Sequence, residues 1–150
     1  MVDNYCNMTY VKYTLVHPNA LMPLYMSEGA AGADIFSCER VTIGVNESAL
    51  VRTGVCIEMH AGIEAQIRSR SGLALRHGVK IFQGVGTIDS DFRGEIKALL
   101  INMGSEPFFI KEGDRIAQIV FAPVLQAEFL NVPMLNNSDR STSGWGSTGK

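Results

Sequence analysis

Residues 84–95 read Gly-Val-Gly-Thr-Ile-Asp-Ser-Asp-Phe-Arg-Gly-Glu. This segment combines two aspartates, three glycines and an aromatic residue within a short stretch. Asp89 and Asp91 stand two residues apart, so a strand would present both carboxylates on one face. The glycines permit positive φ or a close approach of backbone to a ligand. Phe92 adds a flat apolar ring. We expect a turn-bounded β element that holds a small planar charged ligand, and a surface hairpin with solvated acids is the plainer alternative.

Length and composition indicate one ordinary globular domain. The chain has 150 residues, a net charge of −2 and 46% hydrophobic residues. A slightly acidic chain is a poor candidate for nucleic-acid binding, which usually needs a basic face. No apolar run approaches the roughly 20 residues that cross a bilayer, so no membrane partner is expected.

The cysteines and the N-terminus predict a cytoplasmic protein. The three cysteines form no Cys-x-x-Cys pair and no zinc spacing with the three histidines, so reduced thiols are expected. The first residues lack a basic region followed by an apolar run, which argues against a signal peptide.

Short alternating segments between glycines and prolines predict an all-β domain, either a barrel or a sandwich. Only residues 71–77 have helical character. The expected strands cover residues 10–16, 41–43, 49–57, 63–70, 79–82, 96–103, 107–110, 115–122 and 126–132.

Several polar residues suggest an anion site. The alternation of residues 63–70 places Arg68 and Arg70 on one strand face, and Ser71 is a candidate N-cap; a helix start beside arginines binds anions, although Ser-Gly can also be an ordinary turn. Asp34 follows a segment of small residues and is either a ligand or a turn cap. Gln118 interrupts an apolar strand, where a hydrogen-bonded core amide is the commoner role.

The composition changes after residue 135. We therefore divide the chain into a β domain, residues 1–135, and a mobile glycine- and serine-rich tail, residues 136–150. The tail nevertheless carries Arg140, Trp145 and several hydroxyls. A segment that becomes ordered over a ligand is the alternative interpretation.

Five segments together resemble the trimeric dUTPase family (deoxyuridine triphosphate nucleotidohydrolases), in the family's order and over most of the chain. They are residues 31–34, 70–74, 86–95 and 113–118, and Arg140 together with residues 144–149. The segment 86–95 is the most specific, and any one segment alone would be a weak signal. The resemblance implies a jelly-roll-like β-barrel and a homotrimer with active sites between subunits, over which the tail closes.

The resemblance also implies the reaction and the role of each residue. The expected reaction is Mg²⁺-assisted hydrolysis of dUTP to dUMP and pyrophosphate, which keeps uracil out of DNA and supplies dUMP for thymidylate synthesis. Asp89 would activate the attacking water, and Asp34 would meet Mg²⁺ through water. The expected phosphate-binding residues are Arg70, Ser71, Gly72, Gln118, Arg140, Ser147 and Thr148. The expected uracil- and deoxyribose-binding residues are Gln83, Gly86, Thr87, Ile88, Phe92 and Trp145.

The sequence departs from the family pattern at three places. Gln83, on the strand that we expect before the segment 86–95, stands where asparagine is usual, and Phe92 stands where tyrosine is usual. In the tail, Ser141, Thr142, Ser143 and Trp145 stand where glycines and a phenylalanine are frequent. These changes affect substrate affinity and tail flexibility more than the reaction.

Two other functions compete with this interpretation. A dCTP deaminase-like enzyme shares the fold but lacks the segment around Asp89 and the glycine-rich tail. A catalytically silent dUTP-binding homologue would be expected to lose Asp89. Release of pyrophosphate from dUTP separates all three functions.

Overall fold

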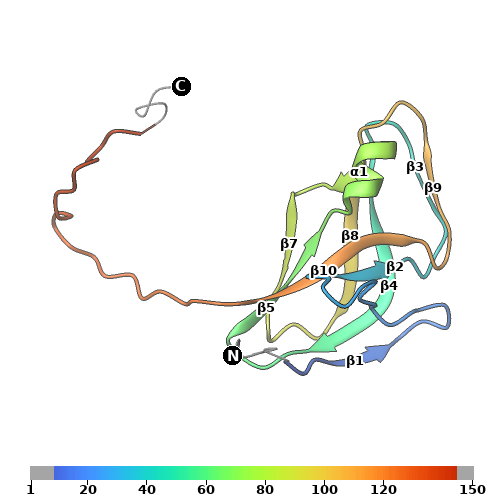
Figure 1. The fold of residues 1–150 in the computed structure, drawn as a ribbon, viewed down its shortest axis with the longest axis horizontal. Helices are drawn as coiled ribbons and strands as arrows, with labels where there is room; N and C mark the ends of the chain where they lie inside the picture. Colours follow the sequence, from blue (N-terminus) through green and yellow to red (C-terminus); the bar gives the residue numbers. More distant parts are fainter. Residues whose placement is uncertain (1–8, 145–150) are drawn as a thin grey trace.

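The computed structural model describes residues 9–144 and shows a β protein with one short helix (Figure 1). The strands are β1 (Lys12–Leu15), β2 (Ala33–Phe36), β3 (Val41–Ile43), β4 (Ser48–Glu58), β5 (Ile63–Arg68), β6 (Val79–Ile81), β7 (Val85–Ile88), β8 (Glu95–Asn102), β9 (Phe108–Ile110) and β10 (Arg115–Pro123). The helix is α1 (Ser71–His77). The all-β prediction with one short helix is confirmed.

The strands form two four-stranded antiparallel sheets and a two-stranded ribbon. The sheet orders are β1-β4-β8-β6 and β2-β10-β5-β7, and the ribbon is β3-β9. This arrangement is consistent with a jelly-roll-like fold. Strand β7 pairs with β5 on one side and has no strand partner on its other side within residues 9–144.

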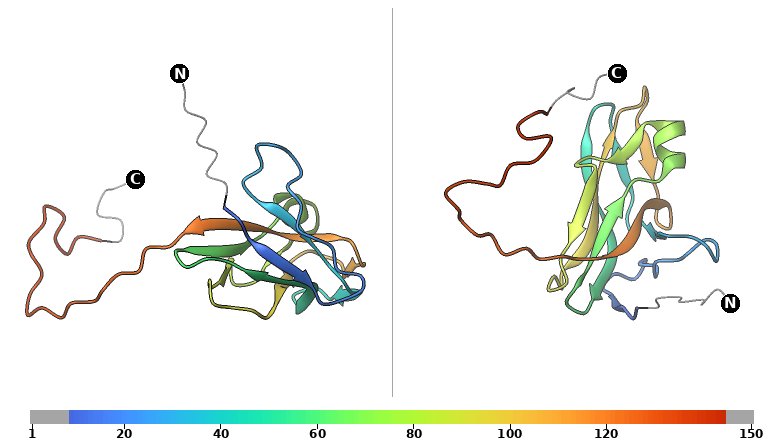
Figure 2. Two further views of the ribbon diagram at one scale, coloured as in Figure 1. Left: turned by 90° about the horizontal axis from the view of Figure 1, so that it is seen from below. Right: turned by 60° about the vertical axis from the view of Figure 1, so that its left-hand side comes forward.

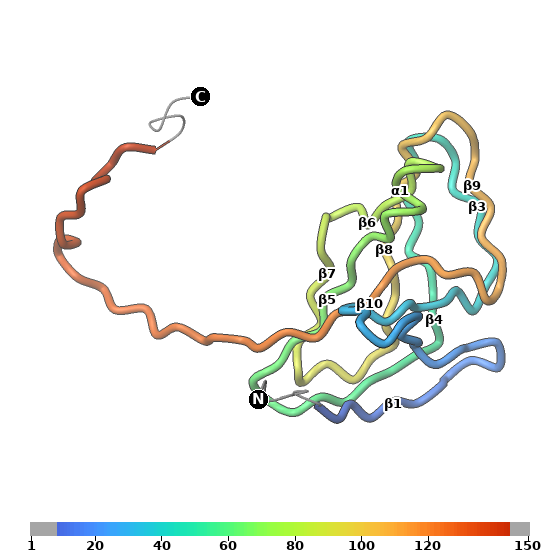
Figure 3. Tube along the Cα trace, in the orientation of Figure 1, coloured from blue at the N-terminus to red at the C-terminus, as the bar shows by residue number. Residues whose placement is uncertain are grey.

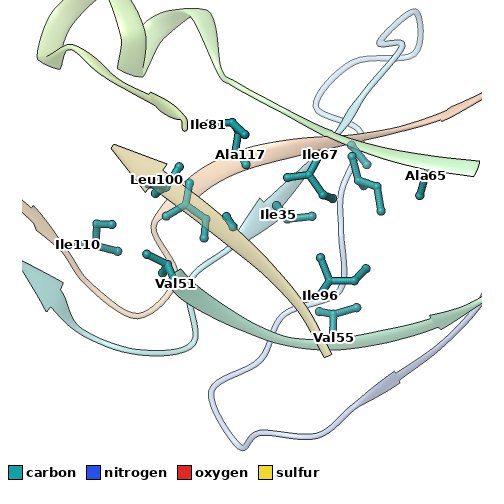
Figure 4. Close-up of a cluster of buried hydrophobic side chains, with 14 of the residues drawn as sticks. Ile35, Val51, Val55, Ala65, Ile67, Ile81, Ile96, Leu100, Ile110 and Ala117 are labelled. Atoms are coloured by element: carbon teal, nitrogen blue, oxygen red, sulfur yellow. The ribbon is translucent and has the colours of Figure 1, made fainter. Parts of the chain in front are cut away.

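The hydrophobic core lies between the sheets, and Figure 4 shows its side chains converging from strands of both. Strand β8 illustrates the pattern, because Ile96, Ala98 and Leu100 are buried whereas Lys97 is exposed. Burying one such isoleucine or leucine contributes about 1.5–3 kcal/mol. The strict alternation of this strand made its prediction from sequence accurate.

Helix α1 begins differently from the expectation. Arg70 is the N-cap residue and its side chain makes no capping hydrogen bond, so Ser71 is the first helical residue rather than the cap. Strand β5 ends at Arg68, and Arg70 therefore does not share a strand face with it. The helix ends at Gly78 in the left-handed region (φ 68°), where its N–H donates to the Ala74 carbonyl.

The chain leaves the body after β10 as an extended arm, residues 124–144. Its first residue still contacts the body, since the Val124 N–H donates to the Gly62 carbonyl at 2.9 Å, and the arm then runs away from the sheets in both views of Figure 2. The strand predicted at residues 126–132 is wrong, because these residues form no strand. Their apolar residues do not alternate regularly, and within residues 9–144 the segment has no strand partner. Apolar side chains are consequently exposed along the arm: Val124, Leu125, Phe129, Leu130, Val132, Met134 and Leu135.

Candidate active site

The first part of the site is a basic cluster of Asp34, Arg70 and Arg115. The Asp34 side chain is only 11% exposed; its Oδ1 lies 3.2 Å from Arg70 Nε and its Oδ2 lies 3.1 Å from Arg115 Nη1. Arg70 Nη1 also donates to the Arg115 carbonyl at 2.9 Å. Asp34 therefore lies on β2 between two guanidinium groups, and the turn-cap alternative is wrong.

Arg115 is the member of this cluster that the sequence interpretation missed. It opens β10, directly after the turn of residues 111–114, where Lys111 N–H donates to the Asp114 carboxylate. Because β10 pairs with β2, Arg115 lies opposite Phe36, two residues along β2 from Asp34, and its side chain reaches the Asp34 carboxylate. The signal available in the sequence was an arginine at the first position of an otherwise apolar strand.

Gln118 lies beside the cluster as a hydrogen-bonded amide. Its Nε2 donates to the Ser69 carbonyl at 2.9 Å. Its Oε1 occupies the space over Gly32, where an added Cβ would lie 2.5 Å away. The Ser69 hydroxyl in turn accepts the Ile81 N–H at 2.9 Å. Gln118 thus supports the backbone that leads into Arg70, Ser71 and Gly72, as a core amide does.

The second part of the site is the outer edge of β7 and the turn before it. The expectation that Gln83 lies on a strand is wrong, because β6 ends at Ile81 and Gln83 is in a turn. Its amide nonetheless lies against Gly86, where an added Cβ would be 3.4 Å from Gln83 Nε2. Thr87 and Ile88 continue the same edge. A strand edge without a partner offers backbone N–H and C=O groups to a ligand.

Asp89 and Asp91 lie in the β7–β8 turn, residues 89–94, and not on a strand. The expectation that they share a strand face is therefore wrong. The Phe92 N–H donates to the Asp89 carbonyl at 3.1 Å and closes the turn. Both carboxylates are exposed, and Asp89 lines a hollow of about 730 Å³ together with Thr87 and the start of the arm.

Phe92 packs back onto its own turn. A Cβ added at Gly94 would lie 2.5 Å from Phe92 Cζ, so the ring occupies the space that glycine leaves. The ring remains 42% exposed. Its face is accordingly available to a ligand beside Asp89.

Asp89 and Arg70 lie at opposite ends of the β5–β7 pair, whose backbone can be followed in Figure 3. Ile88 pairs with Ala65 and Val85 with Arg68, so Asp89 continues the register opposite Glu64 whereas Arg70 lies beyond Arg68. At about 3.3 Å per residue, the offset from Glu64 to Arg70 is roughly 20 Å. One triphosphate cannot contact both ends of the same chain.

Of the predicted tail residues, only Arg140 lies in the described part of the chain, and it is not brought to either part of the site. Arg140 is on the extended arm, where its Nε donates to the Ser143 carbonyl at 2.9 Å. Trp145, Ser147 and Thr148 lie outside the described residues.

The residues present fit a metal ion that arrives with the substrate. Within residues 9–144 there is no group of three or more His, Cys, Asp or Glu side chains placed to hold a metal ion. Mg²⁺ in nucleotide sites is commonly bound by one or two carboxylates and the substrate phosphates, with several waters retained. Asp34 supplies one such carboxylate within the basic cluster. No helix in the described part of the chain is long and apolar enough to span a bilayer.

Comparison with known proteins places these features in a family. The sequence model of the dUTPase family matches residues 18–149. The deoxyuridine 5'-triphosphate nucleotidohydrolase of Nautilia profundicola is 49% identical over 140 residues, which cover 93% of this chain and 99% of that protein. The corresponding protein of Helicobacter pylori (strain P12) is 44% identical over 139 residues, covering 93% and 96%.

Solved structures agree in fold. The Staphylococcus bacteriophage 80alpha dUTPase with dUPNHPP has a TM-score of 0.88 at 26% identity, covering 95% of this chain and 100% of that one. A mutant dUTPase from phage phi11 of S. aureus, described with a structural Mg(II) ion, has a TM-score of 0.78 at 25% identity, covering 85% and 99%. The fold thus defines a jelly-roll-like β enzyme. The chain belongs to the dUTPase family, the dUTP diphosphatases.

Proposed function

We propose that the chain hydrolyses dUTP to dUMP and pyrophosphate in active sites that two or more subunits of a homotrimer build together. The observation that carries this proposal is the roughly 20 Å between the Asp89 end and the Arg70 end of the β5–β7 pair. A base at one end and a phosphate site at the other become one active site only when a second chain supplies the missing half.

Asp89 orients and deprotonates the water that attacks the α-phosphorus. Its carboxylate is exposed in the β7–β8 turn and lines the hollow beside Thr87. A positioned general base contributes typically 10²–10⁴-fold to a rate. Asp34 is less suited to this role, because two guanidinium groups already bind its oxygens.

The basic cluster of another subunit binds the phosphate chain. Phosphoryl transfer depends mainly on positioning and on offsetting negative charge, which Arg70 with the Ser71 and Gly72 backbone supplies. Gln118 adds its amide to the same segment, and Arg140, Ser147 and Thr148 of the tail complete the contacts. Mg²⁺, when bound with the substrate, would neutralise phosphate charge, and Asp34 would meet it through water.

The edge of β7 selects uracil. Its backbone groups complement the O4 and N3–H edge of uracil, while Gln83 adds a side-chain amide. Cytosine presents the opposite polarity, and each buried group left unpaired costs about 1–3 kcal/mol. Phe92 under the sugar leaves no partner for a 2′-hydroxyl. Trp145 would stack on the base when the tail closes, a contact worth roughly 1–3 kcal/mol.

The exposed arm supports assembly. Leu125 and Phe129 are 95% and 96% exposed in the single chain. Large apolar side chains exposed in such numbers usually mark a protein interface. The arm of one chain laid on a neighbour would bury these side chains and carry the tail toward a site on another subunit. A cytoplasmic location remains a prediction.

The test measures pyrophosphate release from dUTP, UTP, dCTP and dTTP, with and without a chelator of Mg²⁺. We expect release from dUTP only, and loss of release with the chelator. Ammonia from dCTP would identify a deaminase instead, and binding of dUTP without any product would identify a silent homologue. Turnover of UTP or dCTP at a rate comparable to that of dUTP would contradict the proposed selection of uracil by the β7 edge and of deoxyribose by Phe92.

A further inference from the structure

The β7–β8 turn crosses from one sheet to the other. Strand β7 belongs to the sheet β2-β10-β5-β7, whereas β8 belongs to the sheet β1-β4-β8-β6. The turn carries both Asp89, the proposed base, and Phe92, whose ring is proposed to lie under the sugar. The positions of both side chains therefore depend on how the two ends of the turn are held. The ladder of β7 with β5 holds the first end, since Ile88 pairs with Ala65. At the second end, the ladder of β4 with β8 pairs Cys56 with Glu95, and the Glu95 side chain adds a further contact with β4.

Arg93 ties the middle of the turn together. Its Nη1 donates to the Ser90 carbonyl at 2.8 Å and to the Phe92 carbonyl at 3.0 Å. These carbonyls belong to the residue after Asp89 and to Phe92 itself. The planar guanidinium suits a contact with two carbonyls at once, because its donors have fixed directions. The arginine is exposed, so this contact is not a by-product of burial.

Glu95 anchors the second end to β4. Its Oε1 accepts the Gly54 N–H at 2.8 Å, and both of its oxygens lie 3.1 Å from Arg52 Nε. The pairing of β4 with β8 shifts between Arg52 and Val55, so Gly54 lies in a bulge that the carboxylate fills. The Glu95 side chain is 14% exposed. A charged pair at this depth, with a backbone donor, fixes the first residue of β8.

We propose that Arg93 and Glu95 are positioning residues for Asp89 and Phe92. Arg93 sets the shape of the turn and Glu95 sets where the turn joins β8. Neither side chain contacts the substrate in the proposed site. The inference rests on the proposed function, because it concerns the geometry of the same hydrolysis.

The decisive variant is Arg93→Ala, because an exposed side chain can be removed without opening the core. A displaced base can cost up to 10²-fold in rate, and we expect roughly a tenfold fall in kcat, with a smaller change in KM. Added guanidinium at millimolar concentration should restore part of kcat, whereas sodium at the same ionic strength should not. Arg93→Lys should fall between Arg93→Ala and the unchanged chain.

Arg40→Ala is the matched control, since Arg40 is also exposed and pairs with Glu112 beside the β3–β9 ribbon. We expect its kcat to stay unchanged and to show no response to guanidinium. For the second anchor, Glu95→Gln keeps an acceptor for Gly54 N–H and should lose less kcat than Glu95→Ala. Glu112→Gln is its control.

The outcomes are distinct. If the unchanged chain releases no pyrophosphate from dUTP, the proposed function fails. If it does so and Arg93→Ala keeps its kcat, the inference is overturned. The inference is also overturned if the activity of Arg93→Ala falls only in proportion to its fraction of folded protein and guanidinium does not restore it.

Discussion

The basic cluster and the β7–β8 turn each contain an aspartate, but the two carboxylates have opposite surroundings. In the basic cluster, the Asp34 carboxylate is nearly buried and is held by Arg70 and Arg115. In the turn, Asp89 is exposed and lies in no ion pair within residues 9–144. The first carboxylate holds two guanidinium groups within a single chain. The second, we propose, keeps its lone pairs for a water molecule.

The difference indicates which part needs a covering element. Charge pairs at low exposure keep their geometry without help, because surrounding atoms restrict the side chains. An exposed carboxylate in water is a weak base and is poorly oriented. We therefore expect the turn to need another subunit and the tail to exclude solvent, whereas the ion pairs of Asp34 form within one chain.

The largest expected effect is that of Asp89→Asn. The amide keeps the shape of the side chain and cannot take a proton, so kcat should fall by 10²–10⁴-fold. Binding of a non-hydrolysable dUTP analogue should change little, because Asp89 contributes no phosphate contact. Steady-state kinetics and calorimetric titration measure the two quantities.

Asp91→Asn is the matched control, since it lies in the same turn and is also exposed. Near-normal kcat in Asp89→Asn together with a large loss in Asp91→Asn would move the base to Asp91. The exposed fraction does not separate the two residues; the internal bond from Phe92 N–H to the Asp89 carbonyl does, because it places Asp89 at the start of the turn.

Mixing two inactive chains tests whether the two regions act across subunits. Asp89→Asn lacks the base and Arg70→Gln lacks the main phosphate contact. If each site takes its base and its phosphate contact from different chains, random mixed trimers should regain about a quarter of the unchanged activity. Activity is assayed after joint refolding of equal amounts. No recovery in mixed trimers would show that one chain supplies both groups.

The sequence predicted the strands well where burial alternates and poorly where a turn decides. Strand β8 was found because Ile96, Ala98 and Leu100 face one core. The face shared by Asp89 and Asp91 was predicted wrongly, because an alternating pattern does not reveal that the chain changes sheets there. The strand predicted at residues 126–132 was wrong for another reason, since a segment rich in apolar residues does not reveal whether a partner strand exists in the same chain.

The site was predicted in its membership more than in its geometry. Asp34 and Arg70 were chosen from separate motifs, and the structure brings them within 3.2 Å of each other. Arg115 was missed, because only the pairing of β10 with β2 reveals that it faces Asp34. The separation of Asp89 from Arg70 depends on the register of β5 with β7, which no local pattern encodes.

Asp34→Asn should have an intermediate effect, by unbalancing the basic cluster. Removing the carboxylate leaves the partly buried Arg70 without its counter-charge, and a lost charged hydrogen bond costs about 1–3 kcal/mol. We expect a lower Tm and a several-fold higher Mg²⁺ concentration at half-maximal rate. Glu112→Gln, which breaks the exposed pair with Arg40, is the control and should change neither quantity. An unchanged Mg²⁺ dependence would restrict Asp34 to ordering the arginines.

Gly94→Ala should have the smallest effect on the rate of dUTP hydrolysis, but it should change the specificity for the sugar. The added methyl would lie 2.5 Å from Phe92 Cζ, so the ring must move while the backbone of the turn can stay. Arg93 still donates to the Ser90 carbonyl and the Phe92 N–H still donates to the Asp89 carbonyl, so the backbone of the turn keeps its contacts. We therefore expect kcat for dUTP to fall only a few-fold. Discrimination against UTP should weaken more, because a displaced ring no longer closes the space under the sugar. The ratio of kcat/KM for dUTP to that for UTP measures this directly.

Gly29→Ala is the matched control, since nothing lies within 4 Å of a Cβ added there. A ratio that stays constant in Gly94→Ala would show that sugar selection comes from the β7 edge or the tail, and not from the ring that rests on Gly94.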